Sequence, residues 1–174
     1  KNNGAIVRTH KSYRSGDESY LGTYVIGYGK RGDILDAQVV NLYTHYLTGE
    51  GQGIAFLTRE NATLVLSYMN SILSQYTVNL YTAQHKISGN VNLLPMPDYA
   101  TRQSDIERIV NAIIDIKRKW FSLDETNLEY HGLIAQMELK GGIEAGLDKM
   151  QEQLTDDYAR YVEIVKENDD LWMD

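Results

Sequence analysis

The stretch Gly53–Asp98, which reads GIAFLTRENATLVLSYMNSILSQYTVNLYTAQHKISGNVNLLPMPD, decides the fold because it contains the changes between several kinds of element. Its short apolar start, Ile54–Leu57, leads into a segment with a helical pattern. Thr58 is a typical N-cap residue, and apolar residues then recur at three- and four-residue spacing. This pattern predicts a helix that ends at about Tyr76 and packs against a sheet. The two prolines in NLLPMP cannot donate backbone hydrogen bonds, so they predict the end of this mixed region.

Two segments before this stretch predict further strands. The region 5–57 is rich in Tyr, Val, Ile and Thr, and its glycines mark turns. The segment YLGTYVIGY at 20–28 has the composition of a strand. The segment DAQVVNLYTHYL at 36–47 is compatible with a strand or with a short helix.

After the prolines the pattern becomes helical. Ser104 and Glu107 form a Ser-x-x-Glu capping box before an apolar stripe, which predicts a helix from about residue 105 to 120. A second helix is predicted over 127–140 and ends at Gly141 and Gly142. The last helix is predicted from Ile143 to about residue 168. The near-heptad spacing of its apolar residues indicates antiparallel packing between helices.

We therefore predict an α+β fold, with a mixed, β-rich domain at 1–98 and an acidic, antiparallel helical region at 99–174. The length of 174 residues suits one domain with a helical appendage. The absence of cysteine excludes a disulfide framework, a thiolate nucleophile and a cysteine zinc site, and it fits a reducing cytoplasm. Because the sequence has no apolar run near the roughly 20 residues that span a bilayer, we expect a cytoplasmic protein with no membrane partner. It begins without Met, so we expect a piece of a longer protein.

The charge is divided unequally between the two halves. Residues 1–97 contain eight Lys/Arg and six Asp/Glu, a net charge of +2, whereas residues 98–174 contain nine and eighteen, a net charge of −9. A slightly basic surface can approach phosphate, but a strongly acidic one is repelled from it. If nucleic acid is the partner, we expect the first half to bind it.

The order of elements in this chain resembles the specificity region of large adenine-specific DNA methyltransferases, found in type IIG restriction-modification enzymes and BREX phage-defence systems. In that family a segment reading roughly "YLNS...Y" is followed by a polar loop and a "P.P" exit. Here YMNSILSQY at 68–76 is followed by HKISGN and then by NLLPMP. The tract WFSLDET at 120–126 resembles a second tract of the family, loosely "DW.S.ET". The closing YVEIVKENDDLW resembles the "KENE" at the end of the helices that follow that tract, so the resemblance covers about Gly53–Trp172.

The resemblance implies a target-recognition-like first domain that reads double-stranded DNA for a catalytic methyltransferase domain of the same parent chain. That domain would bind S-adenosylmethionine. The present sequence has neither a glycine-containing cofactor loop in a strand–helix context nor the Asn/Asp-Pro-Pro-Tyr/Phe tetrapeptide that holds a flipped adenine. We therefore expect no cofactor and no catalytic residue in this chain. Its four histidines are far apart and lack metal-ligand spacing, so we also expect no metal site.

Cations and amides beside glycines gather in three tracts, RTHKSYR at 8–14, GKRG at 29–32 and QHKISGN at 84–90. Arg and Lys suit phosphate and guanine, while Asn suits adenine, and glycine allows close approach of the backbone to DNA. Each residue alone is equally compatible with an ordinary surface charge. The predicted DNA-binding residues are Arg8, Lys11, Arg14, Lys30, Arg31, His85, Lys86 and Asn90.

A different class of protein fits part of the same composition. Thirteen tyrosines and the acidic second half suit a protein interface, because Tyr combines a large contact area with a polar group. The alternative is therefore a phage or plasmid protein that binds and inhibits a host nuclease or defence complex. A plain helical structural partner is a third possibility. Salt-dependent DNA binding distinguishes the first hypothesis from the other two.

Overall fold

A computed structural model provides the structure of the chain. It describes residues 24–40, 51–56, 58–82, 84–97, 99, 101–127, 129–138 and 140–173. The chain divides into two compact units, Lys1–Gln103 and Ser104–Asp174. A small antiparallel sheet and several helices give an α+β structure, which confirms the predicted fold class.

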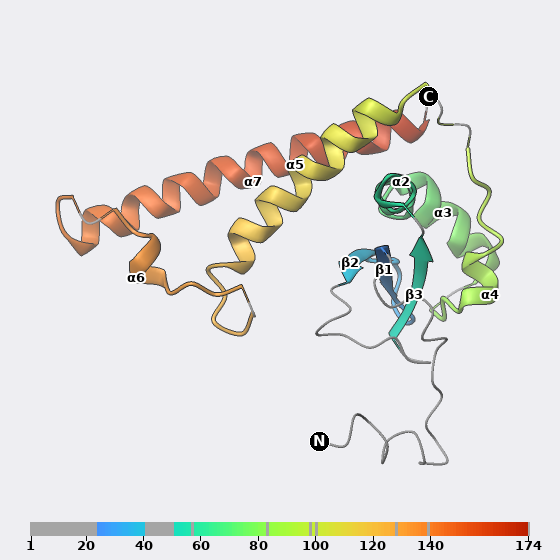
Figure 1. Cartoon of the computed structure of the whole chain (residues 1–174), viewed down its shortest axis with the longest axis horizontal. Coiled ribbons are helices and arrows are strands. Elements are labelled where there is room, and N and C mark those ends of the chain that lie inside the picture. Colours follow the sequence, from blue (N-terminus) through green and yellow to red (C-terminus); the bar gives the residue numbers. More distant parts are fainter. Residues whose placement is uncertain are drawn as a thin grey trace, which may run out of the picture. The chain divides into compact units, whose positions relative to one another are not determined.

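The sheet of the first unit has three strands, β1 (Tyr24–Gly29), β2 (Gln38–Val40) and β3 (Gly51–Phe56) (Figure 1). The strand order is β2-β1-β3, and both pairs are antiparallel. In the described part of the chain, β1 and β2 overlap the two segments for which the sequence predicts strands, and β3 lies in the same region, 5–57, that is rich in strand-forming residues. Residues 20–23 and 41–47 of those two segments lie outside the described residues.

Two helices follow β3 where the sequence pattern predicts one. Helix α2 spans Arg59–Met69, and helix α3 spans Ile72–Tyr81. The N-cap prediction is confirmed, because the side chain of Thr58 accepts a hydrogen bond from Asn61 N (3.3 Å). The prediction of a continuous helix is wrong, since Ser71 is itself an N-cap and begins a second helix.

The core of the first unit lies between the sheet and α2, which packs against β1 and β3. Val25 and Ile26 of β1, which project to opposite faces of the sheet, are both buried, as are Tyr68 and Met69 of α2. Leu35, from the connection between β1 and β2, is fully buried as well. Burial of a leucine side chain contributes about 1.5–3 kcal/mol, so Leu35 anchors this connection to the core. A one-turn helix, α4 (Ser88–Val91), follows α3.

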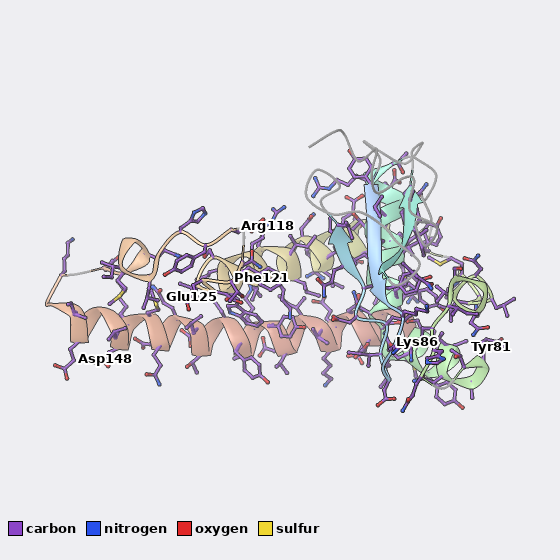
Figure 2. All side chains as sticks on the ribbon, turned by 90° about the horizontal axis from the view of Figure 1, so that it is seen from below. Tyr81, Lys86, Arg118, Phe121, Glu125 and Asp148 are labelled. Atoms are coloured by element: carbon purple, nitrogen blue, oxygen red, sulfur yellow. The ribbon has the colours of Figure 1, made fainter. Side chains whose placement is uncertain are left out.

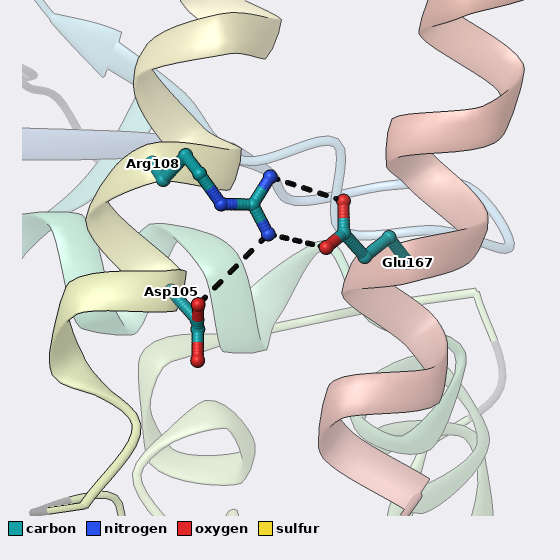
Figure 3. Close-up of polar contacts among 3 residues, drawn as sticks. All are labelled: Asp105, Arg108 and Glu167. Carbon is teal, nitrogen blue, oxygen red and sulfur yellow. Dashed lines mark hydrogen bonds and ion pairs between the residues drawn. The ribbon is translucent and has the colours of Figure 1, made fainter.

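The second unit is built on two long helices, α5 (Gln103–Phe121) and α7 (Ile143–Met173). Helix α5 confirms the predicted helix, although it begins before the Ser104 expected as its cap. Its C-terminal end pairs with the middle of α7, whereas Arg108 near its start forms an ion pair with Glu167 near the end of α7 (Figure 3). The two helices are therefore antiparallel, as predicted. Ile109, Ile116 and Ile164 form their buried core.

The helix predicted over 127–140 is wrong. Within the described residues of this segment, the structure has one helical turn, α6 (Leu133–Gln136). Gly132 immediately before it has a φ of 86°, which is outside the helical region. Farther upstream, Asp124 Oδ1 accepts hydrogen bonds from the backbone N and the hydroxyl of Thr126, which favours a turn. In the part of the chain that the structure describes, no helix is long and apolar enough to cross a membrane.

Candidate nucleic-acid interface

Two of the predicted DNA-binding tracts lie side by side in the first unit. The turn 30–32 follows β1, and the segment 84–86 follows α3; together we call them the basic clasp. Arg31 and His85 are partners in an isolated antiparallel β-bridge between these two segments. Two backbone hydrogen bonds flank this pair, from Gly32 N to Gln84 O (3.1 Å) and from Lys86 N to Lys30 O (2.7 Å). The main chain therefore joins two tracts that are more than fifty residues apart in the sequence.

Arg31 and His85 are the exposed residues at the centre of the clasp. Directly opposed residues of an antiparallel pair project to the same side, with Cβ atoms about 4.5–5.5 Å apart. The guanidinium and the imidazole are therefore within reach of one small anionic group. A guanidinium can donate two parallel hydrogen bonds to a phosphate or to the edge of guanine.

Lys86 has a different environment from its neighbour His85. Successive residues of an extended segment point to opposite sides, and Lys86 points inward, where it is fully buried. Its ammonium group donates a hydrogen bond to the carbonyl oxygen of Gly32, so it supports the turn from beneath. The DNA-contact role predicted for Lys86 does not fit this burial, because a buried ammonium cannot reach a phosphate.

The other predicted residues occupy less central positions. Lys30 is half-buried beside Arg31 in the turn, and Asn90 is half-buried in α4. Arg8, Lys11 and Arg14 lie outside the described residues. The structure thus brings Lys30 and Arg31 together with His85 and Lys86, and Arg31 and His85 are the pair that it presents to solvent.

Three amide side chains hold the connection that continues from this turn to β2, and we call them the amide clamp. Asn70, at the end of α2, and Gln75 and Asn79, on α3, all donate to or accept from backbone groups of residues 33–37. The bonds are Ala37 N to Asn70 Oδ1 (3.0 Å), Asn70 Nδ2 to Ala37 O (2.9 Å), Leu35 N to Gln75 Oε1 (2.8 Å) and Asn79 Nδ2 to Asp33 O (3.1 Å). The role of these amides could not be predicted from the sequence, although Asn70 and Gln75 belong to the YMNSILSQY segment.

The charge around the clasp is mixed. Asp33 and Asp36 are exposed on the connection that follows Arg31. Asp36 Oδ2 accepts a hydrogen bond from Gln38 Nε2 (3.2 Å), which directs that carboxylate toward β2. Asp33 is two residues from Arg31 and opposes the attraction of an anion to the turn.

The second unit has the opposite electrostatic character. Helix α7 contains nine Asp/Glu and three Lys/Arg, and Asp148 projects from the side of α7 that faces away from α5 (Figure 2). Two cations of α5 are engaged within the unit. Lys119 forms an ion pair with Asp157, and Lys117 Nζ lies 4.7 Å from the ring centroid of Tyr161. These contacts favour a packing role for the basic end of α5, and the acidic surface of α7 disfavours phosphate.

Tyr28 and Glu167, whose side chains have shifted pKa values, are involved in packing and in an ion pair, respectively. Burial raises the pKa of Tyr28, whose hydroxyl donates to Gln52 Oε1 (2.9 Å). In the second unit, the hydrogen bond from Arg108 lowers the pKa of the Glu167 carboxyl. Across the described ranges, no group of three His, Asp or Glu side chains could hold a metal ion.

The basic clasp can therefore bind an anion or the edge of a base through an exposed guanidinium and imidazole. Both groups can donate hydrogen bonds without any change in the backbone that carries them. Binding, rather than the making or breaking of a covalent bond, is the chemistry that this pair supports. In comparisons with known proteins, no family model, no curated protein and no solved structure matches this chain.

Proposed function

We propose that this chain is the DNA sequence-recognition module of a bacterial adenine-specific DNA methyltransferase or restriction-modification protein. The observation that carries the proposal is the basic clasp, in which two distant tracts with DNA-binding composition present Arg31 and His85 together. The resemblance of the YMNSILSQY, HKISGN and NLLPMP segments to the specificity region of those enzymes supports the same role.

The distribution of charge supports a division of labour between the two units. The first 97 residues have a net charge of +2 and contain the clasp, so they are the part that approaches DNA. The acidic second unit is repelled by phosphate and serves as a spacer or as a docking surface for protein. Methyl transfer and S-adenosylmethionine belong to a catalytic domain of the parent chain.

Arg31 is the residue of the clasp best suited to specific recognition. Its guanidinium can bind phosphate or the O6 and N7 atoms of guanine in a bidentate manner, and a good bidentate base contact is worth about 1–3 kcal/mol of discrimination. His85 beside it can donate to the same phosphate or to a neighbouring acceptor. Lys86 acts through the backbone of the turn and not through direct contact.

The test is selection of bound sequences from a pool of random DNA duplexes at low and moderate salt. The wild-type chain should enrich one short motif, and its affinity should fall as salt rises. Arg31→Ala should weaken binding and reduce the salt slope by about one if the contact is to phosphate, or relax one position of the motif if the contact is to a base.

Arg160→Ala is the matched control, because it removes an exposed arginine from the acidic helix α7. It should leave DNA binding unchanged or slightly stronger. Equal weakening by Arg31→Ala and Arg160→Ala would exclude the clasp as the interface. No retention of DNA at low salt by the wild-type chain would contradict the proposal and favour the alternative of a protein-binding inhibitor of a host nuclease or defence complex.

A further inference from the structure

We infer that Asn70, Gln75 and Asn79 are positioning residues, which fix the loop that carries Arg31 and so set the arrangement of Arg31 beside His85. The inference rests on the proposed function for its DNA-binding consequence. Its structural part concerns the geometry of the clasp alone. Each step follows from hydrogen bonds between these amides and the backbone of residues 33–37.

Asn70 forms a reciprocal pair with the backbone of Ala37. It accepts from Ala37 N (3.0 Å) and donates to Ala37 O (2.9 Å), which is the pattern that a neighbouring strand would supply. Its Nδ2 also donates to Leu66 O (3.1 Å), so the same amide is anchored to α2. Because Ala37 is buried, its backbone groups require such partners.

Gln75 binds the loop two residues earlier, at Leu35, through one hydrogen bond and not a reciprocal pair. Its Oε1 accepts from Leu35 N (2.8 Å), and its Nε2 donates to Met69 O (2.6 Å). Leu35 is fully buried, and between it and Ala37 the residue Asp36 has a φ of 45°. The two amides therefore hold both sides of a residue in the left-handed region, where a non-glycine residue needs support from its surroundings.

Asn79 extends the clamp to the turn itself. Its Nδ2 donates to Asp33 O (3.1 Å), two residues from Arg31. A hydrogen bond from Gly29 N to Leu35 O (2.8 Å) closes the loop 30–34 at its base. The loop is thus held by α3 on one side and by the segment 84–86 on the other. Binding to a loop that is already ordered avoids the entropy cost of ordering it.

Asparagine and glutamine side chains can also recognise adenine. The hydrogen bonds that Asn70 and Gln75 already make therefore decide between a role in holding the loop and a role in contacting a base. Bidentate recognition of adenine uses both the amide oxygen and the amide nitrogen. In Asn70 and in Gln75 both groups are already bonded within the protein. Reading a base would require breaking those bonds, so the geometry assigns them to the loop and not to DNA.

The experiment compares Asn70→Ala with Asn61→Ala, which removes an exposed amide from the same helix. Both changes are made in the full chain and again in the Arg31→Ala background. Amide hydrogen exchange at Ala37 and the NMR shifts of Arg31 and of the His85 imidazole report on the loop. Affinity for the selected duplex reports on binding.

Asn70→Ala should speed exchange at Ala37 by about tenfold or more and shift the signals of Arg31 and His85. In the otherwise wild-type chain, Asn70→Ala should lower DNA affinity by about three- to tenfold. In the Arg31→Ala background it should lower the affinity no further. Asn61→Ala should change none of these quantities. Unchanged exchange and shifts would overturn the inference, as would an equal loss of affinity with and without Arg31.

Failure of DNA binding and failure of the positioning role give different results. If the wild-type chain binds no duplex DNA, the proposed function fails. The NMR comparison then decides the positioning role by itself, because shifts at Arg31 and His85 in Asn70→Ala support it and their absence overturns it. Glutamine at position 70 gives a second variant for the case in which Asn70→Ala does not fold, since Asn70→Gln retains the amide but displaces it by one methylene. Restoration of the wild-type shifts by that longer amide would contradict a role that depends on position.

Discussion

Replacing Gly32 with alanine tests whether the turn of the basic clasp depends on its backbone conformation. Gly32 has a φ of 118°, which side-chain-bearing residues rarely adopt. A Cβ at this position would meet no atom within 4 Å, so the substitution introduces no clash. Any loss of stability then reports the conformation alone. Gly89 is the matched control, because its added Cβ also meets no atom within 4 Å and it lies in the helical turn α4.

The expected free-energy changes have opposite signs. Holding alanine at a positive φ costs about 1–3 kcal/mol, and the reduced entropy of the unfolded chain offsets about 0.4–1 kcal/mol of this. Gly32→Ala should therefore destabilise the chain by about 1–2 kcal/mol. Gly89→Ala needs no strained conformation and should stabilise it by about 0.5–1 kcal/mol. The two variants should differ by about 2 kcal/mol.

Urea denaturation of the wild-type chain and the two variants measures this difference. With a slope of about 2 kcal/mol per molar urea, the midpoints of the variants should be separated by about 1 M, with Gly89→Ala the higher. A Gly32→Ala variant as stable as Gly89→Ala would refute the argument, because the turn would then accept a side chain without strain. Equal slopes for all three proteins are the control that the same structure unfolds.

Three further predictions concern caps, core and ion pairs. Ser71→Ala should destabilise the first unit by about 1–2 kcal/mol in urea denaturation, because a fully buried hydroxyl loses its role as the N-cap of α3. Ile109→Ala should cost about 2–5 kcal/mol, whereas Ile143→Ala, at an exposed position, should change stability by less than about 0.5 kcal/mol; equal effects would contradict the core assignment. Because the hydrogen bond from Arg108 lowers the pKa of Glu167, the pair stabilises the fold above the ordinary glutamate pKa and loses this effect as pH falls through the lowered value. Glu167→Gln should therefore be slightly less stable than wild type at neutral pH and equal to it in strong acid, and a difference that persists in acid would disprove the linkage.

The long elements of this fold could be predicted from the sequence because their signals are local. The apolar stripe of α5 and the repeating apolar residues of α7 identify both helices and their antiparallel packing. The residues of β1 identify it as a strand, and Thr58 identifies the start of α2. Each of these signals depends on residues within a few positions of one another.

The features that could not be predicted depend on partners far along the chain. The bonds of Asn70, the residue that follows α2, go to the backbone of Ala37, 33 residues away. The inward direction of Lys86 depends on a carbonyl group at Gly32, 54 residues away. A local sequence pattern does not indicate contacts between distant residues. It therefore predicted a continuous helix and a lysine available to DNA. Lys30, Arg31 and His85 could be named as candidates from the sequence, but their proximity could not be predicted.

The isolated bridge between Arg31 and His85 has a consequence for how such a surface can change. Its hydrogen bonds are made by backbone groups of the flanking residues, and the supporting lysine lies on the opposite side. The two outward positions can therefore exchange side chains while the scaffold beneath them is retained. A surface of this kind can acquire a new target by substitution at two positions, without a change of fold, and those positions are the natural ones to randomise in a library.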